Sequence, residues 1–318
     1  MKAAQIDRFG GPEEFHIVDD APTPTPAPGE VLVRVLAAGV NPLDYKIRDG
    51  SSGLAKKLGP ADFPLILGRE ASGIVEEVPE SAAAAGLSVG DRVYGMAPIQ
   101  HRGGCYAELV ALPADVLAPM PDGVDPVALA GPGLAGITAW TAVHDLADVG
   151  PDDVVLVHGG GGGVGQFVVQ LAVAAGATVY ATASAGHHDR IASWGATPVD
   201  YRTQDFREVT PRPTVIVDGV YFGTYEPSMD HLAEGGRLVV LPSLADLEPA
   251  RARGIDASIP TISADRERLT KLARLVADGT LKVEVSQVLP LAEVARAHEA
   301  IEGGHTAGKI VLDVGLDA

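Results

Sequence analysis

Residues 154–175 read VVLVHGGGGGVGQFVVQLAVAA, and this stretch decides the fold. The apolar run Val154–His158 has the length and the β-branched content of a buried strand. Five consecutive glycines follow it, and the apolar segment Gly163–Ala175 predicts a helix. A second strand is predicted at Thr178–Ala183, so the glycines lie on a tight turn between a strand and a helix. The stretch therefore predicts the first βαβ unit of a doubly wound parallel sheet.

The glycine turn also predicts a ligand. A backbone without side chains can approach a diphosphate closely, and the helix N-terminus adds oriented N–H donors and partial positive charge. A flexible glycine hinge is the alternative, but the strand before and the helix after the turn are the context that the motif requires. The residues that we assign to the dinucleotide from this turn are Gly159, Gly162, Gly163, Val164 and Gly165.

The end of the second strand indicates which dinucleotide is bound. A site for NAD would place Asp or Glu there to accept from the ribose hydroxyls, but the chain continues with Ser184 instead. Ser184, His187 and Arg190 supply donors that suit a 2′-phosphate, which favours NADPH. An alternative that stays open is that His187 and Arg190 only form the solvated start of a helix.

The pattern of predicted secondary structure changes after Pro119. Short β-rich runs before it predict an antiparallel, barrel-like N-terminal domain, and they are Lys2–Ile6, Phe15–Val18, Val31–Leu36, Ile74–Val78, Asp91–Gly95 and Ala107–Ala111. Apolar strands that alternate with helices follow and predict a parallel sheet covered by helices. The later elements are expected at Pro126–Leu146 (helical), Arg190–Trp194 (helical), Val199–Asp200, Thr214–Asp218, Arg237–Leu241, Arg266–Asp278 (helical), Val283–Val288, Leu291–Glu302 (helical) and Lys309–Val314.

Composition restricts the partners. The formal charge of −18 repels phosphate backbones, so nucleic acid is not expected to bind. The single cysteine, Cys105, excludes an intrachain disulfide and a cysteine-rich zinc lobe. No Asp, Glu, Lys or Arg occurs from Val154 to Gly186, but the five glycines make a membrane span a poor reading of that run. Because the start MKAAQIDRFG does not look like a signal peptide, we expect a cytoplasmic protein without a membrane partner.

Several motifs occur in a characteristic order. They are AAGVNPLDYKIRDG (37–50), PLILGREASGIVEEV (64–78), VGDRVYGM (89–96), GGCYAELV (103–110), LAGITAWTAV (134–143), the glycine turn and HTAGKIVLDV (305–314). In this order the chain resembles the zinc-independent quinone oxidoreductases and alkenal or enone reductases of the medium-chain dehydrogenase/reductase superfamily. The resemblance runs over nearly the whole chain.

The resemblance implies an α/β protein with two domains. A GroES-like β-barrel catalytic domain would comprise residues 1–119 and 262–318, and a Rossmann domain with a doubly wound parallel sheet would comprise residues 120–261. A homodimer, paired through an edge strand near Ile255–Ile262, is also implied. The further cofactor contacts that it implies are Thr138, Tyr201, Ser243 and Lys309. His187 stands where relatives often have lysine, and a neutral imidazole binds phosphate less strongly than an ammonium, so a preference for NADPH that is modest or depends on pH is expected.

The resemblance also bears on the metal. Related alcohol dehydrogenases hold a catalytic zinc with a Cys on the loop that matches Asn41–Asp44 and with a His before a Glu. This chain has Asn41 on that loop and Arg69 before Glu70, so we expect no metal. Arg69 is expected to pair with a carboxylate such as Asp44 or Glu70.

Without a Lewis acid, conjugate hydride transfer is easier to support than reduction of a plain ketone, since its enolate needs only hydrogen-bond donors. We expect Asn41, Tyr45 and Lys46, on one loop, to be the catalytic residues. The expected function is therefore NADPH-dependent reduction of small quinones or enones. A tailoring reductase or cyclase acting on one large substrate, and a non-catalytic sensor of NADPH, remain as alternatives.

Overall fold

The computed structural model describes residues 1–263, 265–304 and 306–316. Residue His305, which opens the last motif, lies outside the described residues. The chain forms two compact units, residues 1–134 with 263–318 and residues 135–262. The junctions therefore follow residues 134 and 262, whereas the resemblance implied junctions after residues 119 and 261. The expected limits, residues 1–119 with 262–318 and residues 120–261, remain a prediction about which parts of the chain fold as separate domains.

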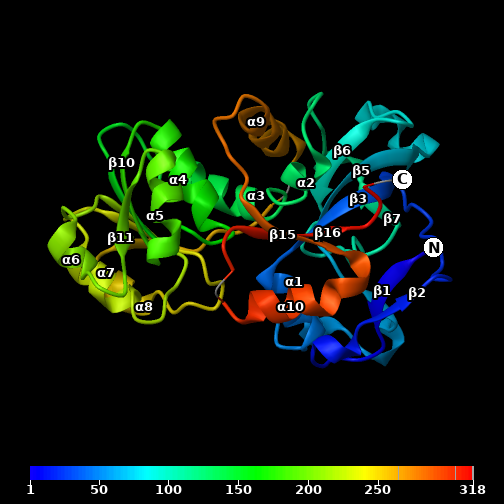
Figure 1. Cartoon of the computed structure of the whole chain (residues 1–318), viewed down its shortest axis with the longest axis horizontal. Coiled ribbons are helices and arrows are strands. Elements are labelled where there is room, and N and C mark those ends of the chain that lie inside the picture. Colours follow the sequence, from blue (N-terminus) through cyan, green and yellow to red (C-terminus); the bar gives the residue numbers. More distant parts are fainter. Residues whose placement is uncertain (264, 305, 317–318) are drawn as a thin grey trace. The chain divides into compact units, whose positions relative to one another are not determined.

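The unit of residues 135–262 contains a six-stranded sheet in the order β11-β10-β9-β12-β13-β14. Figure 1 labels two of its strands, β10 and β11, and helices α4 to α8 of the same unit. All its strand pairs are parallel. The strands are β9 (Val154–His158), β10 (Thr178–Ala183), β11 (Thr197–Asp200), β12 (Val215–Asp218), β13 (Arg237–Val240) and β14 (Asp256–Ser258). The chain runs outward from β9 to β11 and then returns to β12 on the other side of β9. This reversal is the switch point at which doubly wound sheets bind their ligands.

Helices connect the strands of this unit, as a parallel sheet requires, and two further helical segments precede its first strand β9. The helical segments are α3 (Ala135–Trp140), a π-helical turn (Thr141–Leu146), α4 (Gly165–Ala174), α5 (His188–Ser193), α6 (Phe206–Val209), α7 (Tyr225–His231) and α8 (Glu248–Ala252). A one-turn segment, Ala185–His187, precedes α5. Strand β9 is apolar and almost wholly buried, because helices cover both faces of such a sheet.

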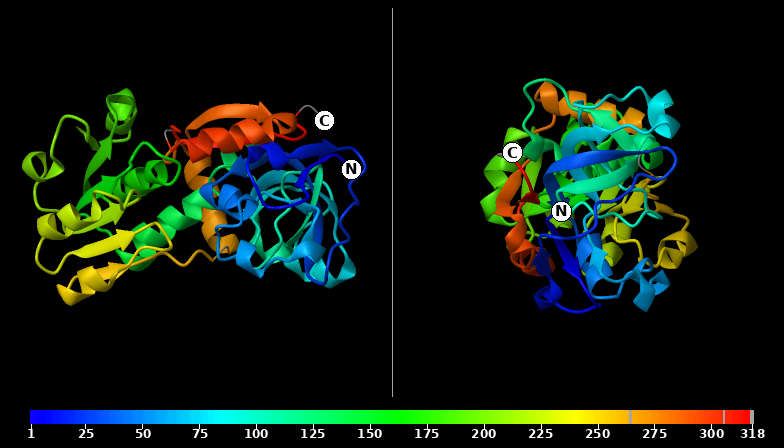
Figure 2. Two further views of the ribbon diagram at one scale, coloured as in Figure 1. Left: turned by 90° about the horizontal axis from the view of Figure 1, so that it is seen from below. Right: turned by 90° about the vertical axis from the view of Figure 1, so that its right-hand side faces the viewer.

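The other unit is built mainly from antiparallel strands. Its large sheet has the order β15-β16-β3-β5-β6-β8, with β7 also paired to β3, and a smaller sheet has the order β2-β1-β4. The strands are β1 (Ala3–Ile6), β2 (His16–Val18), β3 (Glu30–Val40), β4 (Leu65–Ile66), β5 (Glu70–Glu77), β6 (Arg92–Met96), β7 (Leu109–Pro113), β8 (Leu117–Pro119), β15 (Val285–Pro290) and β16 (Lys309–Asp313). Figure 2 shows the C-terminal elements, in orange and red, joining the blue N-terminal part. The pairing of β16 with β3 makes this join.

Short helices surround these strands. They are α1 (Pro42–Arg48), α2 (Pro126–Leu129), α9 (Arg266–Ala277) and α10 (Val294–Glu302), with one- or two-turn 3-10 segments at Pro12–Glu14, Ala55–Lys57, Pro60–Asp62, Glu80–Ala85, Ala114–Val116 and Leu291–Glu293. The main core of this unit is a large cluster of mostly aliphatic side chains from the sheet strands, closed by residues of α10 such as Val294 and Ala297. The predicted fold class, a GroES-like barrel with a doubly wound parallel sheet, is confirmed.

Two expectations about elements are wrong. Residues Asn41–Lys46 do not form a loop, since α1 begins at Pro42. The single helix expected at Pro126–Leu146 is broken, because Gly131, Pro132 and Gly133 separate α2 from α3. Glycine and proline are the poorest helix formers, which accounts for this break. No helix in the described part of the chain is both long and apolar enough to cross a membrane.

Candidate active site

The glycine turn joins β9 to α4 and has no room for a side chain at Gly160 or Gly165. A Cβ atom on Gly165 would lie 2.1 Å from the carbonyl oxygen of Gly159, and one on Gly160 would lie 2.6 Å from the Cβ of Ala181. Gly159 itself has φ +79°, a left-handed conformation that glycine adopts without strain. Close packing around the turn therefore requires glycine at these positions. We call residues 159–165 the cradle.

The amides of the turn fall into two groups. Those of Gly159, Gly160 and Gly162 donate to Thr182 Oγ1 at 3.3 Å, Thr182 O at 3.0 Å and Gly159 O at 3.0 Å. Within the described residues, the N–H groups of Gly161, Gly163 and Val164 have no acceptor. Unpaired N–H groups at the start of a ten-residue helix suit an anion. A dinucleotide diphosphate fits this cradle.

The predicted contacts of the adenosine phosphate lie at the same edge of the sheet. Strands β10 and β11 pair Ala183 with Asp200, so Ser184 and Tyr201 follow at adjacent positions. Arg190 Nη2 lies 2.6 Å from His187 Nδ1 and donates to it, because a guanidinium has no acceptor atom. Nδ1 of His187 is therefore the acceptor in this hydrogen bond. The structure brings Ser184, His187, Arg190 and Tyr201 together.

Two other predicted cofactor residues lie elsewhere in this unit. Thr138 is buried in α3, at 5% exposure. Ser243 is exposed and follows β13, beyond the carboxyl end of the sheet. Strands β12 and β13 pair Asp218 with Val240, so Ser243 belongs to the loops at the same edge as the glycine turn. Their roles stay predictions.

In the barrel unit, a buried ion pair holds Asn41. The ammonium of Lys309 contacts Glu70 Oε1 at 2.9 Å and donates to Asn41 Oδ1 at 2.6 Å and to Val40 O at 3.1 Å. Asn41 Nδ2 donates to Glu70 Oε1 at 2.8 Å, and the amide of Leu134 donates to Glu70 Oε2 at 2.6 Å. All three side chains are at most 3% exposed. All three N–H donors of the Lys309 ammonium therefore have acceptors within this unit.

Helix α1 starts at this cluster. The amide of Asn41 donates to Asp44 Oδ2 at 2.8 Å, which closes the first turn of the helix, as expected of a residue that orients this segment. The hydroxyl of Tyr106 donates to the same oxygen at 3.1 Å. Burial raises the pKa of Asp44 to about 7, although these hydrogen bonds oppose the shift. Asp44 is therefore a carboxyl group that can carry a proton near neutral pH.

The other two predicted catalytic residues lie further along α1. Lys46 is exposed, and its Nζ lies 5.9 Å from the centre of the Tyr45 ring. Burial and the nearby carboxylates of Asp49 and Glu302 raise the pKa of Tyr45, so its hydroxyl stays protonated. The helix therefore presents an ammonium and a phenol from adjacent residues.

The expectation that Arg69 pairs with the carboxylate of Asp44 or Glu70 is wrong. Its guanidinium donates to backbone oxygens of the segment after β6, to His101 O at 2.6 Å and to Pro98 O. Within the described chain, Arg69 Nε and Asp44 Oδ1 are both buried without a hydrogen-bond partner. Burial lowers the pKa of Arg69, and the Asp44 carboxylate opposes this shift by electrostatic attraction without a hydrogen bond to Arg69.

The donor set here is poor for a metal. Burial raises the pKa of the Cys105 thiol, so it is not a ready thiolate. His101 accepts from the amide of Gly103 at 3.0 Å and contacts Glu30 at 3.2 Å, as expected of a locally satisfied histidine. No group of three or more His, Cys, Asp or Glu suited to a metal occurs in the ranges that the structure describes.

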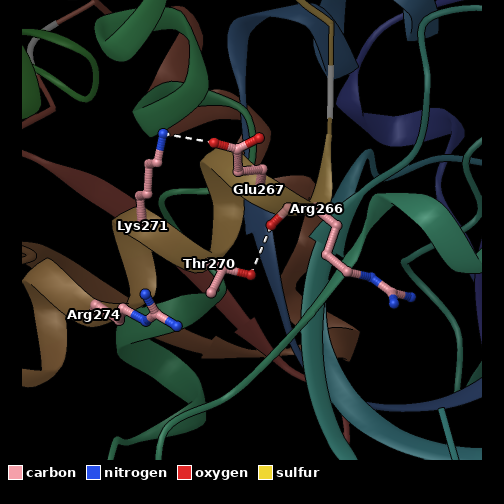
Figure 3. A pocket seen from close by; sticks show the side chains of 5 residues that line it. All are labelled: Arg266, Glu267, Thr270, Lys271 and Arg274. Carbon is pink, nitrogen blue, oxygen red and sulfur yellow. Dashed lines mark hydrogen bonds and ion pairs between the residues drawn. The ribbon is translucent and has the colours of Figure 1, made fainter. Parts of the chain in front are cut away.

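Sequence reasoning missed the partners of this cluster. Glu70 and Lys309 form a buried pair, and the buried Arg48 contacts His298 Nδ1 at 3.1 Å and the carboxylate of Glu302. The signals were weak, since a lone Glu or Lys on a strand is usually a surface residue. A surface hollow on α9 (Figure 3) contains none of the predicted residues, and it is lined by Arg266, Glu267, Thr270, Lys271 and Arg274.

Comparisons with known proteins cover most of the chain. The family described as alcohol dehydrogenase GroES-like domain matches residues 27–122, and the family described as zinc-binding dehydrogenase matches residues 194–312. A 2-haloacrylate reductase of a Burkholderia species is 32% identical over 98% of this chain and 98% of its own length. A mycocerosic acid synthase-like polyketide synthase of Mycobacterium tuberculosis is 32% identical over 95% of this chain, which spans only 15% of that relative.

Solved structures agree with these matches. The quinone oxidoreductase of Coxiella burnetii has a TM-score of 0.92 and 35% identity, over 99% of both chains. The quinone oxidoreductase of Escherichia coli, solved in complex with NADPH, has a TM-score of 0.83 and 28% identity over 98% of this chain and 100% of its own.

Proposed function

The chain belongs to the medium-chain dehydrogenase/reductase superfamily, on the branch with the quinone oxidoreductases and 2-haloacrylate reductase, and we propose that it is an NADPH-dependent reductase of quinones or enones. One observation carries the proposal: unpaired amides of a glycine-rich turn lie in a fold that matches, along nearly its whole length, a structure solved with NADPH. The shape of this turn depends on glycine, because a Cβ on Gly160 would collide with Ala181 and one on Gly165 would collide with the Gly159 carbonyl.

The residues proposed to hold NADPH follow from the geometry of this unit. The amides of Gly161, Gly163 and Val164 would bind the diphosphate, and His187 and Arg190 would bind the 2′-phosphate. We assign Ser184, Tyr201, Thr138 and Ser243 to further contacts with NADPH. Lys309 is no longer proposed as a direct contact, because its ammonium already has three acceptors.

The names of the relatives share one piece of chemistry. A quinone and a 2-haloacrylate both contain a carbon–carbon double bond conjugated to a carbonyl carbon. Bound NADPH supplies a hydride to such an acceptor. The chain must then stabilise negative charge on the carbonyl oxygen, and donors aimed at that oxygen are sufficient.

We assign this stabilisation to α1. Lys46 is an exposed ammonium and Tyr45 a protonated phenol, so both can donate to an oxygen that gains charge. Asn41 is 1% exposed and uses both ends of its amide, so its proposed role is to fix the start of α1. The proposal is independent of zinc, since Asn41 and Arg69 supply neither thiolate nor imidazole where alcohol dehydrogenases have them.

A second candidate is a biosynthetic tailoring reductase. It is favoured by the match of 95% of this chain to a segment of a polyketide synthase. Such an enzyme would reduce the double bond of an unsaturated acyl thioester with the same residues.

We also propose that the protein is a cytoplasmic homodimer that binds only small molecules. Strand β14 ends the six-stranded order, so it offers a second copy an edge that is unpaired among the described residues. The formal charge of −18 disfavours nucleic acid. Light scattering on the purified chain tests the dimer, and a monomer at micromolar concentration would contradict it.

A panel of acceptors tests the proposed function. The purified chain is mixed with NADPH and with benzoquinone, an enone, 2-chloroacrylate, crotonyl thioester or a saturated ketone, and the loss of the nicotinamide absorbance is followed. Consumption with conjugated acceptors, but not with the saturated ketone, is expected. Exclusive turnover of the thioester would select the second candidate, and no turnover with any acceptor despite NADPH binding would contradict both.

A further inference from the structure

We propose that His158 is a positioning residue that sets the shape of the glycine turn through Thr182. The inference rests on the proposed function, since it concerns the same dinucleotide cradle. His158 is the last residue of β9 and directly precedes Gly159. It is 1% exposed, so its ring cannot contact solvent or ligand and must act through its neighbours.

The ring of His158 lies between two hydroxyl groups. Its Nδ1 is 3.1 Å from Oγ1 of Thr182 on β10, and its Nε2 is 3.0 Å from Oγ of Ser228 on α7. The ring also packs edge-on against Phe206, with 4.7 Å between ring centres. Both ring nitrogens are therefore in use, and the orientation of the ring is fixed.

Thr182 accepts two hydrogen bonds from the glycine turn. Its hydroxyl accepts from the amide of Gly159 at 3.3 Å, and its carbonyl accepts from the amide of Gly160 at 3.0 Å. These two bonds set the direction in which the chain leaves β9. They therefore determine where the unpaired amides of Gly161, Gly163 and Val164 stand.

Proton accounting selects one form of the imidazole. The Thr182 hydroxyl accepts from Gly159, so its own proton needs an acceptor, and a neutral His158 provides one at Nδ1. Nε2–H then donates to Ser228, so the Thr182 hydroxyl and both ring nitrogens are satisfied. Burial lowers the pKa of His158 to about 4, which keeps the ring neutral at the pH of a cell.

The same residue joins the two halves of the sheet. The carbonyl of His158 accepts from the amide of Gly219 at 3.1 Å, and β9 pairs with both β10 and β12 at this position. His158 thus ties the glycine turn to α7 at the switch point of the sheet.

Asparagine and glutamine at residue 158 separate this role from simple packing. The amide of Asn reaches about where Nδ1 lies and can still accept from Thr182, whereas that of Gln reaches about where Nε2 lies and keeps only the contact with Ser228. We expect His158→Asn to bind NADPH with nearly the wild-type Kd. His158→Gln and Thr182→Val should each raise the Kd about tenfold, with kcat at saturating NADPH little changed.

A fragment of the cofactor localises the effect. Adenosine 2′-monophosphate carries the 2′-phosphate but neither phosphate of the bridge, so its Kd should be the same in all four proteins. The double variant of His158→Gln with Thr182→Val should be no weaker than either single variant, because both remove the same hydrogen bond. Amide exchange of Gly159 and Gly160, measured without nucleotide, should be faster in His158→Gln than in His158→Asn.

Three results would overturn this role. They are a wild-type Kd for NADPH in folded His158→Gln and Thr182→Val, an equal loss of affinity for NADPH and adenosine 2′-monophosphate, or equal amide exchange in the Asn and Gln variants. A wild-type chain that binds no NADPH would overturn the proposed function itself, which is a separate and distinguishable result.

Discussion

Lys46 carries the proposed chemistry at the residue scale, because it is the exposed ammonium of α1 beside a protonated phenol. Replacement by methionine keeps much of the side-chain length and removes the charge. We expect Lys46→Met to lower kcat on enones by about 100-fold, as loss of a donor to a developing oxyanion does elsewhere. The KM for NADPH should stay near the wild-type value.

Lys57 provides a matched control for this change, since it is also an exposed lysine on a short helical segment of the same unit. Lys57→Met should have wild-type kinetics. Unchanged turnover in Lys46→Met would remove Lys46 from the mechanism.

Arg190 is the residue that should distinguish NADPH from NADH. Its guanidinium is paired with His187, and both carry donors at the edge where Ser184 and Tyr201 meet. Arg190→Gln should raise the Kd for NADPH about tenfold and leave the Kd for NADH unchanged, because only NADPH has the 2′-phosphate. Titration with each dinucleotide measures the ratio of the two Kd values. An equal change in the Kd for NADPH and for NADH would show that Arg190 does not recognise the 2′-phosphate.

At the scale of elements, the ion pair of Glu70 and Lys309 links the beginnings of β5 and β16 to the end of β3. Lys309→Met leaves a buried carboxylate without its cation, so it should lower the free energy of unfolding by about 3–5 kcal/mol. The double variant with Glu70→Gln removes both charges and should recover part of that loss. Denaturant unfolding measures both, and a single variant as stable as the wild type would contradict the account.

The sequence predicted elements well where one local rule decides them. The limits of β9 and β10 are as expected, since apolar β-branched runs end at glycine or serine. Helix α1 was missed although Asn41, Pro42 and Asp44 form an N-terminal helix signal, because the resemblance had suggested a loop. The expected helix at 126–146 ignored its Gly-Pro-Gly interruption.

At the scale of the whole molecule, the candidate site was predicted only in part. The glycine turn and the residues after β10 are close in sequence, so one βαβ unit brings them together. The contact of Asn41 with Lys309 joins residues 268 positions apart and depends on β16 returning to β3. No local pattern in the sequence encodes such a pairing, so Lys309 was assigned to the cofactor instead of to Glu70.

Stability should depend on pH through three buried groups. Burial lowers the pKa of His158 to about 4 and that of His298 to about 3, so the unfolded chain binds protons first and stability falls as pH drops below 6.5. Burial raises the pKa of Asp44 from 3.8 to about 7, so its contribution has the opposite sign and is lost as pH rises between those values.

The variant Asp44→Asn isolates the last contribution. Its stability relative to the wild type should improve as pH rises from 3.8 to about 7, because only the wild type must keep a carboxyl protonated. Thermal unfolding across this range measures the difference. A constant difference in Tm would contradict the raised pKa of Asp44.

Calorimetric titration of NADPH into the folded chain tests the central claim most directly, with Gly165→Ala and Gly150→Ala as a matched pair. A Cβ on Gly165 would lie 2.1 Å from Gly159 O, whereas one on Gly150, which precedes β9, would meet nothing within 4 Å. We predict binding heat for the wild type and for Gly150→Ala, and little or none for folded Gly165→Ala. Absence of heat with the wild type, or equal affinity in all three proteins, would contradict the claim that this glycine turn binds a dinucleotide.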